Sequence, residues 1–240
     1  MWAISRATAD GKLRVEDLHA EYEARLELGY HSTLPKVVSI AQSTEYGTLY
    51  TNQEVKAIAD WCHSHDMYLH MDGCRLPNAL VALDSDLVTA TRDAGVDVLC
   101  FGGAKNGLMN AEAVIIFNAP EQSIPRVQKQ LLQLSSKMRY VSAQFIPYLT
   151  DDLWRKNAEH ANTLAKQLAD ALVEIDGVSL TQALQTNQVF LVMPTELKEK
   201  LHAAGHHFYD WDVPKQEVRL VTAWDNKTED IQRLMQDAKS

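Results

Sequence analysis

Two ionisable residues stand where a sheet of parallel strands would bind a ligand. Asp72 follows an apolar run at residues 67–71, and Lys105 lies in a glycine-flanked loop after a second apolar run at 96–101. Ligands of open α/β sheets bind in the crevice beyond the carboxyl ends of the strands. A lysine there can form a Schiff base, and a carboxylate can keep a pyridinium nitrogen protonated. The pair predicts pyridoxal phosphate chemistry, and the alternative is a turn carboxylate with a solvated loop lysine.

Both residues lie within longer motifs. Residues 70–79 read HMDGCRLPNA, and residues 101–107 read FGGAKNG before a further apolar run. Two shorter segments follow, SKMR at 136–139 and RLVT at 219–222. In this order the four segments resemble those of the low-specificity threonine aldolases, which belong to the wider group of aldolases and β-eliminating lyases. The resemblance spans nearly the whole chain and implies an aspartate-aminotransferase-like fold (PLP fold type I).

The resemblance implies roles for five residues. Lys105 would form the Schiff base with pyridoxal 5'-phosphate, and Asp72 would pair with its pyridinium nitrogen. Arg75 would lie beside the cofactor ring near the phenolate oxygen, and Arg139 would reach the phosphate. Arg219 would bind the substrate carboxylate, a task that suits the two parallel hydrogen bonds of a guanidinium group.

The activity implied is that of a PLP-dependent lyase of the threonine aldolase type. Such an enzyme cleaves L-threonine and related β-hydroxy-α-amino acids to glycine and an aldehyde. Many relatives carry a histidine near the cofactor in the segment equivalent to 43–47, and this chain has none there, so the catalytic base stays unassigned. Another PLP reaction, β-elimination or transamination, and a truncated non-catalytic homologue are the alternatives.

The resemblance also bears on assembly. Relatives carry a substantial N-terminal portion before the segment equivalent to Gly11, including a phosphate-binding segment and a residue that stacks on the ring. The large domain is therefore expected to be N-terminally incomplete. Relatives build their active sites across subunit interfaces, which implies a homo-oligomer, either a dimer or a tetramer. Cys74 stands where the relatives' D-G-A-R motif has alanine.

Hydrophobic patterning predicts the elements that position these residues. We expect an α/β large domain at 1–149 and a small α+β domain at 150–240. A long amphipathic helix from about Leu153 to Ile175 would bridge them. Strands of the large domain are expected at 37–41, 67–71, 96–101 and 113–117, with a turn at Asp72 and Gly73. Its helices are expected at 52–64, 76–82 and 86–93, and the small domain should have strands at 189–193 and 218–222 and helices at 195–204 and 228–238.

Composition excludes several classes of function. Of 240 residues, 46% are hydrophobic and 23% are charged, as in a folded globular protein, and the net charge of −9 disfavours nucleic acid and anionic membranes. Three cysteines without a C-x-x-C pair, and the lack of an apolar leader or an 18-residue apolar run, predict a cytoplasmic protein. The loop at 102–107 does not match the P-loop pattern. A metal site would need His63, His65, His70 and Asp72 together, and no metal is expected because His63 and His65 point to different faces of a helix.

Overall fold

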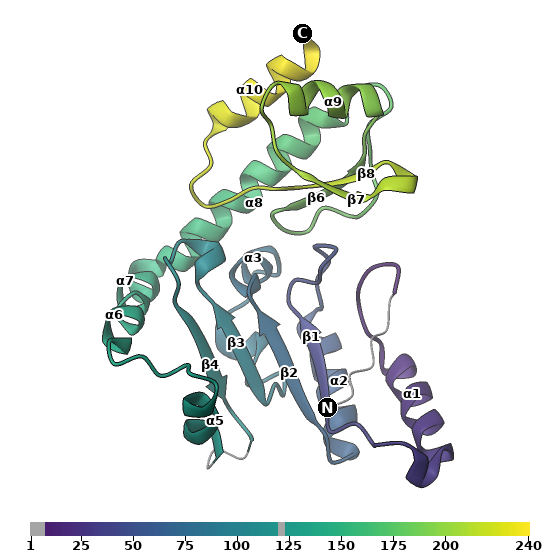
Figure 1. Ribbon diagram of the computed structural model, residues 1–240, viewed down its shortest axis with the longest axis vertical. Coiled ribbons are helices and arrows are strands. Elements are labelled where there is room, and N and C mark those ends of the chain that lie inside the picture. Colours follow the sequence, from purple (N-terminus) through teal and green to yellow (C-terminus); the bar gives the residue numbers. More distant parts are fainter. Residues whose placement is uncertain (1–7, 120–122) are drawn as a thin grey trace.

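The computed structural model describes residues 8–119 and 123–240, which form two bodies joined by one long helix (Figure 1). The start of the chain at 1–6, where the sequence predicts no apolar leader, lies outside the described residues. One hydrophobic core lies within the first body and includes Leu69, Met71 and Leu80. The other lies within the second body and includes Leu172, Val189 and Leu201.

The first body is built on a four-stranded sheet in the order β1-β2-β3-β4. The first three strands are parallel, as the apolar runs and the helices between them predict, and β4 is antiparallel. As the last strand of the sheet, β4 is exposed on its outer edge, and Val114 is 63% accessible. The strands are β1 (Val37–Ala41), β2 (Tyr68–Gly73), β3 (Val98–Gly102) and β4 (Glu112–Ile116).

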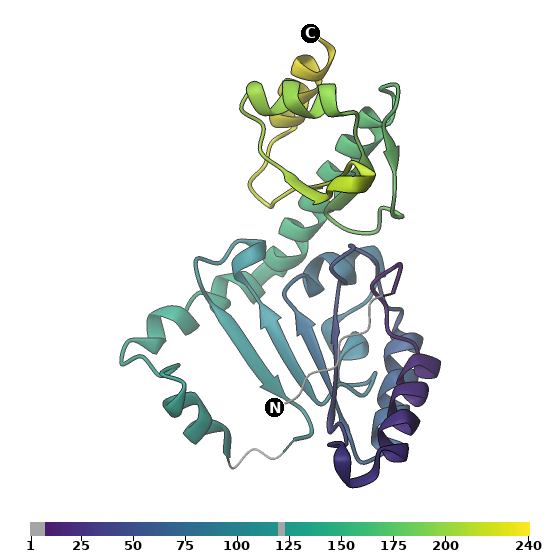
Figure 2. The same cartoon turned by 45° about the vertical axis from the view of Figure 1, so that its right-hand side comes forward.

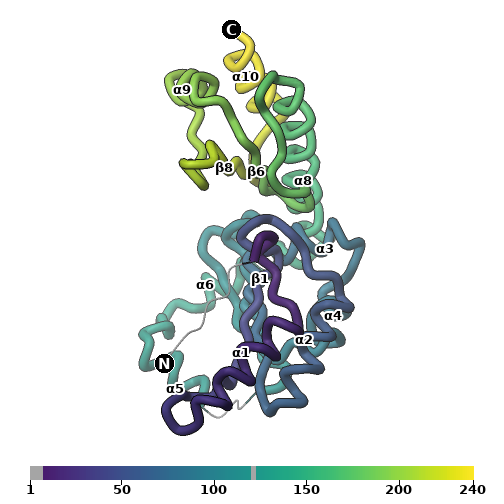
Figure 3. Tube along the Cα trace, turned by 90° about the vertical axis from the view of Figure 1, so that its right-hand side faces the viewer, coloured from purple at the N-terminus to yellow at the C-terminus, as the bar shows by residue number. Residues whose placement is uncertain are grey.

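Helices cover one face of this sheet. Leu69 and Met71 point from β2 into the core beneath the helices, and His70 and Asp72 alternate with them on the opposite, half-buried face. Figure 3 shows α2, α3 and α4 on one side of β1 and α5 and α6 on the other. The covering helices are α2 (Asn52–Ser64), α3 (Leu76–Ala82) and α4 (Leu87–Ala90), with α1 (Val15–Glu27) and the short η1 (Gly29–His31) beside them.

Two local predictions in this body are wrong. Asp72 and Gly73 do not form a turn but end β2, because they still pair with Cys100 and Phe101 of β3. The helix expected at 86–93 begins as predicted, with Asp86 capping it, but it ends at Ala90. It ends there because Thr91 leaves the helical conformation, with φ −124° and ψ −84°.

Helix α8 (Leu153–Leu172) connects the two bodies, as its amphipathic pattern predicts. Trp154 at its beginning packs into the first core, and Leu168 and Leu172 near its end pack into the second. Reciprocal hydrogen bonds hold α8 to α3. The Asn78 amide donates to Asn162 Oδ1 at 3.0 Å, and the Asn162 amide donates to the Asn78 carbonyl at 2.9 Å.

The second body carries an antiparallel sheet in the order β5-β6-β8-β7. Its helices lie on one face, and in Figure 1 the other side of the sheet lies toward the first body. The predicted strands and helices are all present, and β5 and β7 are additions that the sequence did not predict. The elements are β5 (Ser179–Leu180), β6 (Gln188–Val192), α9 (Thr195–Ala203), β7 (Tyr209–Asp212), η5 (Val213–Lys215), β8 (Glu217–Val221) and α10 (Thr228–Lys239).

The segment between β4 and α8 was not predicted to be helical. Within the described residues, α5 and α6 are only seven and five residues long and bury no side chain fully, so they are too short for a clear helical repeat of apolar residues. Figure 2 shows them beyond the β4 edge, away from the body of the sheet. The segment comprises α5 (Ile124–Gln130), α6 (Met138–Ser142), α7 (Phe145–Leu149) and η4 (Thr150–Asp152), and the loop before β4 contains η2 (Ala104–Asn106).

Candidate active site

Asp72 lies at the carboxyl end of β2, beside Cys100 of the neighbouring strand. Its Oδ1 accepts a hydrogen bond of 2.9 Å from the backbone N–H of Cys74. Partial burial by itself would raise the pKa of Asp72, but hydrogen bonds from Cys74 and the positive charge of Lys105 outweigh burial and lower it. Asp72 is therefore an anion at neutral pH, as a partner for a protonated ring nitrogen must be.

Lys105 projects from η2, just beyond the end of β3, and its side chain is exposed. The residue after it anchors this loop. The buried Asn106 amide donates to Tyr148 Oη at 2.7 Å and to the Trp154 carbonyl at 2.8 Å, and its own carbonyl accepts from Asn157 Nδ2 at 2.9 Å. A fixed backbone thus presents the Lys105 amine, whose positive charge helps to lower the pKa of Asp72.

Arg75 follows Asp72 at the beginning of α3 and is half-buried. Burial, and next the positive charge of Arg219, lower the pKa of Arg75, while the charge of Glu45 acts in the opposite direction. The Nε atom of Arg75 is buried and has no hydrogen-bond partner among the described residues.

Arg219 reaches the same region from the second body. It lies on β8 and donates a hydrogen bond through Nη2 to the side-chain oxygen of Gln188. Its guanidinium lies 5.7 Å from the ring centre of Phe190 and 5.2 Å from that of Trp211, within the range of cation–π attraction. Its Nε atom, like that of Arg75, is buried without a partner in the described part of the chain.

The two arginines come from separate bodies, and the positive charge of Arg219 lowers the pKa of Arg75. Like charges that share a partly buried region are unfavourable unless an anion lies with them. Buried polar atoms normally have hydrogen-bond partners, so the two Nε atoms that have none among the described residues indicate that an acceptor belongs with them. With the Asp72 carboxylate and the Lys105 amine, this set of groups fits a cofactor and substrate with a ring nitrogen, an aldehyde and anionic oxygens.

Two more groups lie near this site: His70, which the sequence suggested only as a metal ligand, and Gln188, which the sequence did not single out. His70, on the same face of β2 as Asp72, lies between Ser39 Oγ, 2.8 Å from its Nδ1, and Cys100 Sγ, 3.3 Å from its Nε2. Burial lowers the pKa of His70 and so favours its neutral form. Gln188 is the second group, and its sequence context gave no signal because its partners lie far away in the chain.

Other residues that the sequence singled out lie elsewhere. Arg139 is exposed on α6, and none of the described contacts joins it to Asp72 or Lys105. His63 pairs with buried Asp97 at 2.9 Å. Across residues 8–119 and 123–240, no group of three His, Cys, Asp or Glu side chains is arranged to hold a metal. No described helix is long and apolar enough to cross a membrane.

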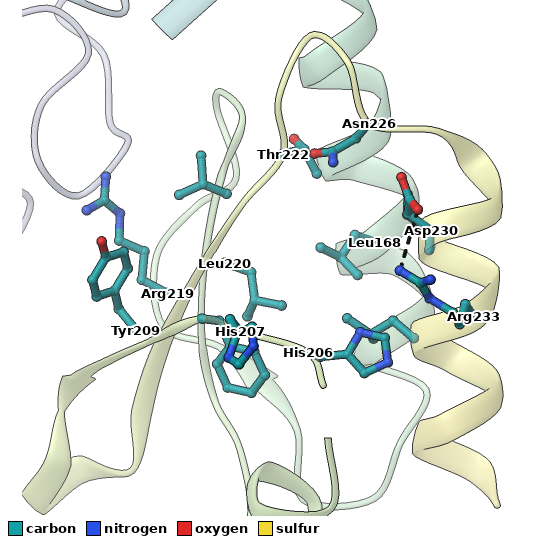
Figure 4. Close-up of a pocket in the computed structure, with 14 residues that line it drawn as sticks. Leu168, His206, His207, Tyr209, Arg219, Leu220, Thr222, Asn226, Asp230 and Arg233 are labelled. Atoms are coloured by element: carbon teal, nitrogen blue, oxygen red, sulfur yellow. Dashed lines mark ion pairs between the residues drawn. The ribbon is translucent and has the colours of Figure 1, made fainter. Parts of the chain in front are cut away.

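A separate cavity of about 400 Å³ lies within the second body, between β8, α8 and α10. Figure 4 shows Leu168, Arg233 and Asp230 on one side of it, with Arg219 and Tyr209 directed away from them. The guanidinium of Arg219 is thus aimed out of this cavity. The cavity and the Asp72 region are different places in the molecule.

The chain is similar to known proteins over most of its length. A profile of the beta-eliminating lyase family matches residues 3–196. The low specificity L-threonine aldolase of Pseudomonas aeruginosa is 39% identical over 210 residues, which cover 87% of this chain and 60% of that protein. The corresponding enzyme of a Pseudomonas species is 37% identical, over 88% of this chain and 61% of its own length. The chain thus spans about three fifths of the length of these curated relatives.

Solved structures share the fold. The threonine aldolase of Leishmania major superimposes with a TM-score of 0.89 and 29% identity, over 98% of this chain and 69% of that one. The match to mouse CSAD, with a TM-score of 0.74 and 15% identity over 97% of this chain and 57% of that one, is a likeness of fold. The fold is therefore that of the fold type I class of pyridoxal phosphate enzymes. Within this class, the chain belongs to the beta-eliminating lyase family.

Proposed function

We propose that the protein is a pyridoxal phosphate-dependent lyase that cleaves L-threonine and related β-hydroxy-α-amino acids to glycine and an aldehyde. The observation that carries the proposal is the convergence of Asp72 and Arg75, Lys105, and Arg219 from three separate segments. Support also comes from the two Pseudomonas aldolases, which match most of the chain. When bound, pyridoxal phosphate supplies an electron sink for the pair of electrons left by the broken Cα–Cβ bond.

Each residue has a role set by its chemistry. Lys105 would hold the cofactor through its free amine, and Asp72 would keep the ring nitrogen protonated because its own lowered pKa keeps it charged. Arg75 would lie beside the ring near the phenolate oxygen. Arg219 would orient the substrate through its carboxylate. Arg139, exposed on α6, would reach the phosphate.

An absorbance titration with pyridoxal phosphate tests the proposal. The purified chain should show a saturable Schiff-base band that Lys105→Ala abolishes and Lys129→Ala retains, because Lys129 is an exposed lysine on α5. Threonine should then yield glycine and acetaldehyde in equal amounts. A band with other products would indicate β-elimination or transamination, and no band would indicate a non-catalytic homologue.

We further propose how the molecule is organised. A large domain at 1–149 and a small domain at 150–240 are supported by the two hydrophobic cores, although Trp154 at the beginning of α8 packs into the first core. A dimer or tetramer would cover the outer edge of β4, where Val114 and Ile115 are exposed. A cytoplasmic location suits the three free cysteines. Light scattering measures the assembly, and a monomer at micromolar concentration would contradict it.

A further inference from the structure

Gln188 is a buried polar residue at the contact between the two bodies. It lies at the beginning of β6 and is 2% exposed. Its side-chain oxygen accepts the hydrogen bond from Arg219, and its Nε2 donates to Ser43 Oγ at 3.1 Å and to the Thr44 carbonyl at 3.3 Å. One amide group therefore connects the arginine of the second body to a loop of the first.

That loop belongs to the same site. Glu45, next to Thr44, contributes to the electrostatic environment of Arg75. Two further hydrogen bonds join the loop to the segment before Gln188. Thr186 Oγ1 donates to the Gly47 carbonyl at 3.2 Å, and the Leu49 N–H donates to the Gln185 side chain at 2.9 Å. The position of Arg219 is thus tied to the loop beside Arg75.

Arg219 needs such a hydrogen bond because its other neighbours do not fix the orientation of its guanidinium group. The positive charge of Arg75 repels it, and its two aromatic neighbours attract the guanidinium without fixing its rotation. The Gln188 oxygen is the acceptor that fixes one Nη atom, and the buried Nε has no acceptor in the described part of the chain.

We propose that Gln188 is a positioning residue that aims Arg219 at the carboxylate of an α-amino acid. Because the amide is uncharged, it orients the guanidinium without neutralising it, whereas a carboxylate in the same place would form an ion pair and compete with the substrate. The inference rests on the proposed function, since it takes the carboxylate of that substrate as the ligand. Gln188 acts through Arg219.

Three variants separate positioning from a structural role. Gln188→Glu keeps the acceptor but adds a competing charge, and Gln188→Met keeps the length but loses the acceptor. Thr186→Val is the matched control, because it removes a neighbouring bond between the bodies without touching Arg219. All three are first compared for folding by circular dichroism and for saturation with pyridoxal phosphate.

The probes are glycine and ethanolamine, which differ only in the carboxylate. Their dissociation constants are measured by tryptophan fluorescence, which reports through Trp211 near Arg219. Gln188→Glu and Gln188→Met should weaken glycine binding about 10- to 100-fold, the range of a hydrogen bond to a charged group, with ethanolamine unchanged. Thr186→Val should change either constant less than about two-fold. For threonine cleavage by Gln188→Glu and Gln188→Met, KM should rise and kcat should change little.

Three results overturn the inference. Equal losses in Thr186→Val and Gln188→Met, or an equal loss of ethanolamine binding, would show that Gln188 only holds the bodies together. A wild-type chain that binds glycine no better than ethanolamine would show that Arg219 receives no carboxylate. Failure of the proposed function looks different, because cleavage would be missing while the dependence of glycine binding on Gln188 persisted.

Discussion

Asn106 anchors the loop that presents Lys105, and replacing it with alanine should loosen both the fold and the site. Its buried amide donates to Tyr148 Oη at 2.7 Å and to the Trp154 carbonyl at 2.8 Å. Tyr148 is fully buried, and burial raises the pKa of its hydroxyl to about 12. Asn106→Ala would leave two buried acceptors without their donor.

The size of the effect follows from those two contacts. A buried polar group left without its partner costs about 1–3 kcal/mol, so the two together should lower the free energy of unfolding by about 2–6 kcal/mol. In the Tyr148→Phe background one of the two acceptors is already missing. The same substitution should then cost about 1–2 kcal/mol less, which makes the two residues energetically coupled.

Urea unfolding followed by tryptophan fluorescence measures these differences. Asn110→Ala is the matched control, since Asn110 is exposed in the same loop and accepts a hydrogen bond from Gln144 at 2.9 Å. It should change stability by less than about 0.5 kcal/mol. Affinity for pyridoxal phosphate should fall in Asn106→Ala because Lys105 loses its fixed backbone.

Two outcomes would refute this reasoning. A loss of stability in Asn106→Ala no larger than that of Asn110→Ala would mean that the buried hydrogen bonds contribute nothing net. Strict additivity with Tyr148→Phe would mean that the amide and the hydroxyl do not interact. Either result would also remove the physical basis for a rigid Lys105 loop.

Three further predictions follow from the same region. Gly107→Ala should destabilise the fold by more than Gly205→Ala, by about 1–3 kcal/mol, because both glycines have positive φ but only at Gly107 would the new Cβ meet a neighbour, Asn157 Nδ2 at 2.7 Å. Burial and the Asp72 charge raise the pKa of Cys74 to about 11, so its alkylation by iodoacetamide should be slow at pH 8, quicken toward pH 11, and speed up in Asp72→Asn. Because the pKa of Asp72 is lowered on folding, its contribution to stability is full above about pH 4 and is lost as pH falls through the folded value, so Asp72→Asn should flatten the acid limb of a pH–stability curve.

For each of these three predictions, one result would contradict it. Equal stabilities of the two glycine variants would show that the Gly107 contact relaxes freely. Mass spectrometry measures the alkylation of Cys74. A rate equal to that of a free thiol would show that neither burial nor Asp72 raises the pKa of Cys74. Identical acid limbs for wild type and Asp72→Asn would show that this carboxylate titrates as it does in the unfolded chain.

The parts of the fold next to Asp72 and Lys105 could be predicted from sequence because their signals are local. A capping box at Thr51 and Glu54 begins α2 where expected, and apolar runs place β1, β2 and β3. Periodic burial and capping depend on residues a few positions apart, and these can be read directly. The motifs around Asp72 and Lys105 also implied the family, which the comparisons confirm.

The end of β2 and the direction of β4 depended on partners elsewhere in the chain. The sequence predicts a turn at Asp72 and Gly73, but in the structure both residues pair with β3, and this pairing extends β2. An apolar run predicts a strand but carries no information on its direction, so the antiparallel, exposed β4 needed the tertiary structure.

The sequence by itself determined which residues carry charge at the ends of which strands, because strand and helix formation follows from neighbouring residues. Only the tertiary structure brings Arg219 close enough for its charge to act on Arg75, and only it shows that Gln188 joins Arg219 to Ser43. These residues are far apart in the chain, and no local periodicity relates them. They meet because α8 buries its two ends in different cores, and that packing sets where the second sheet lies over the first.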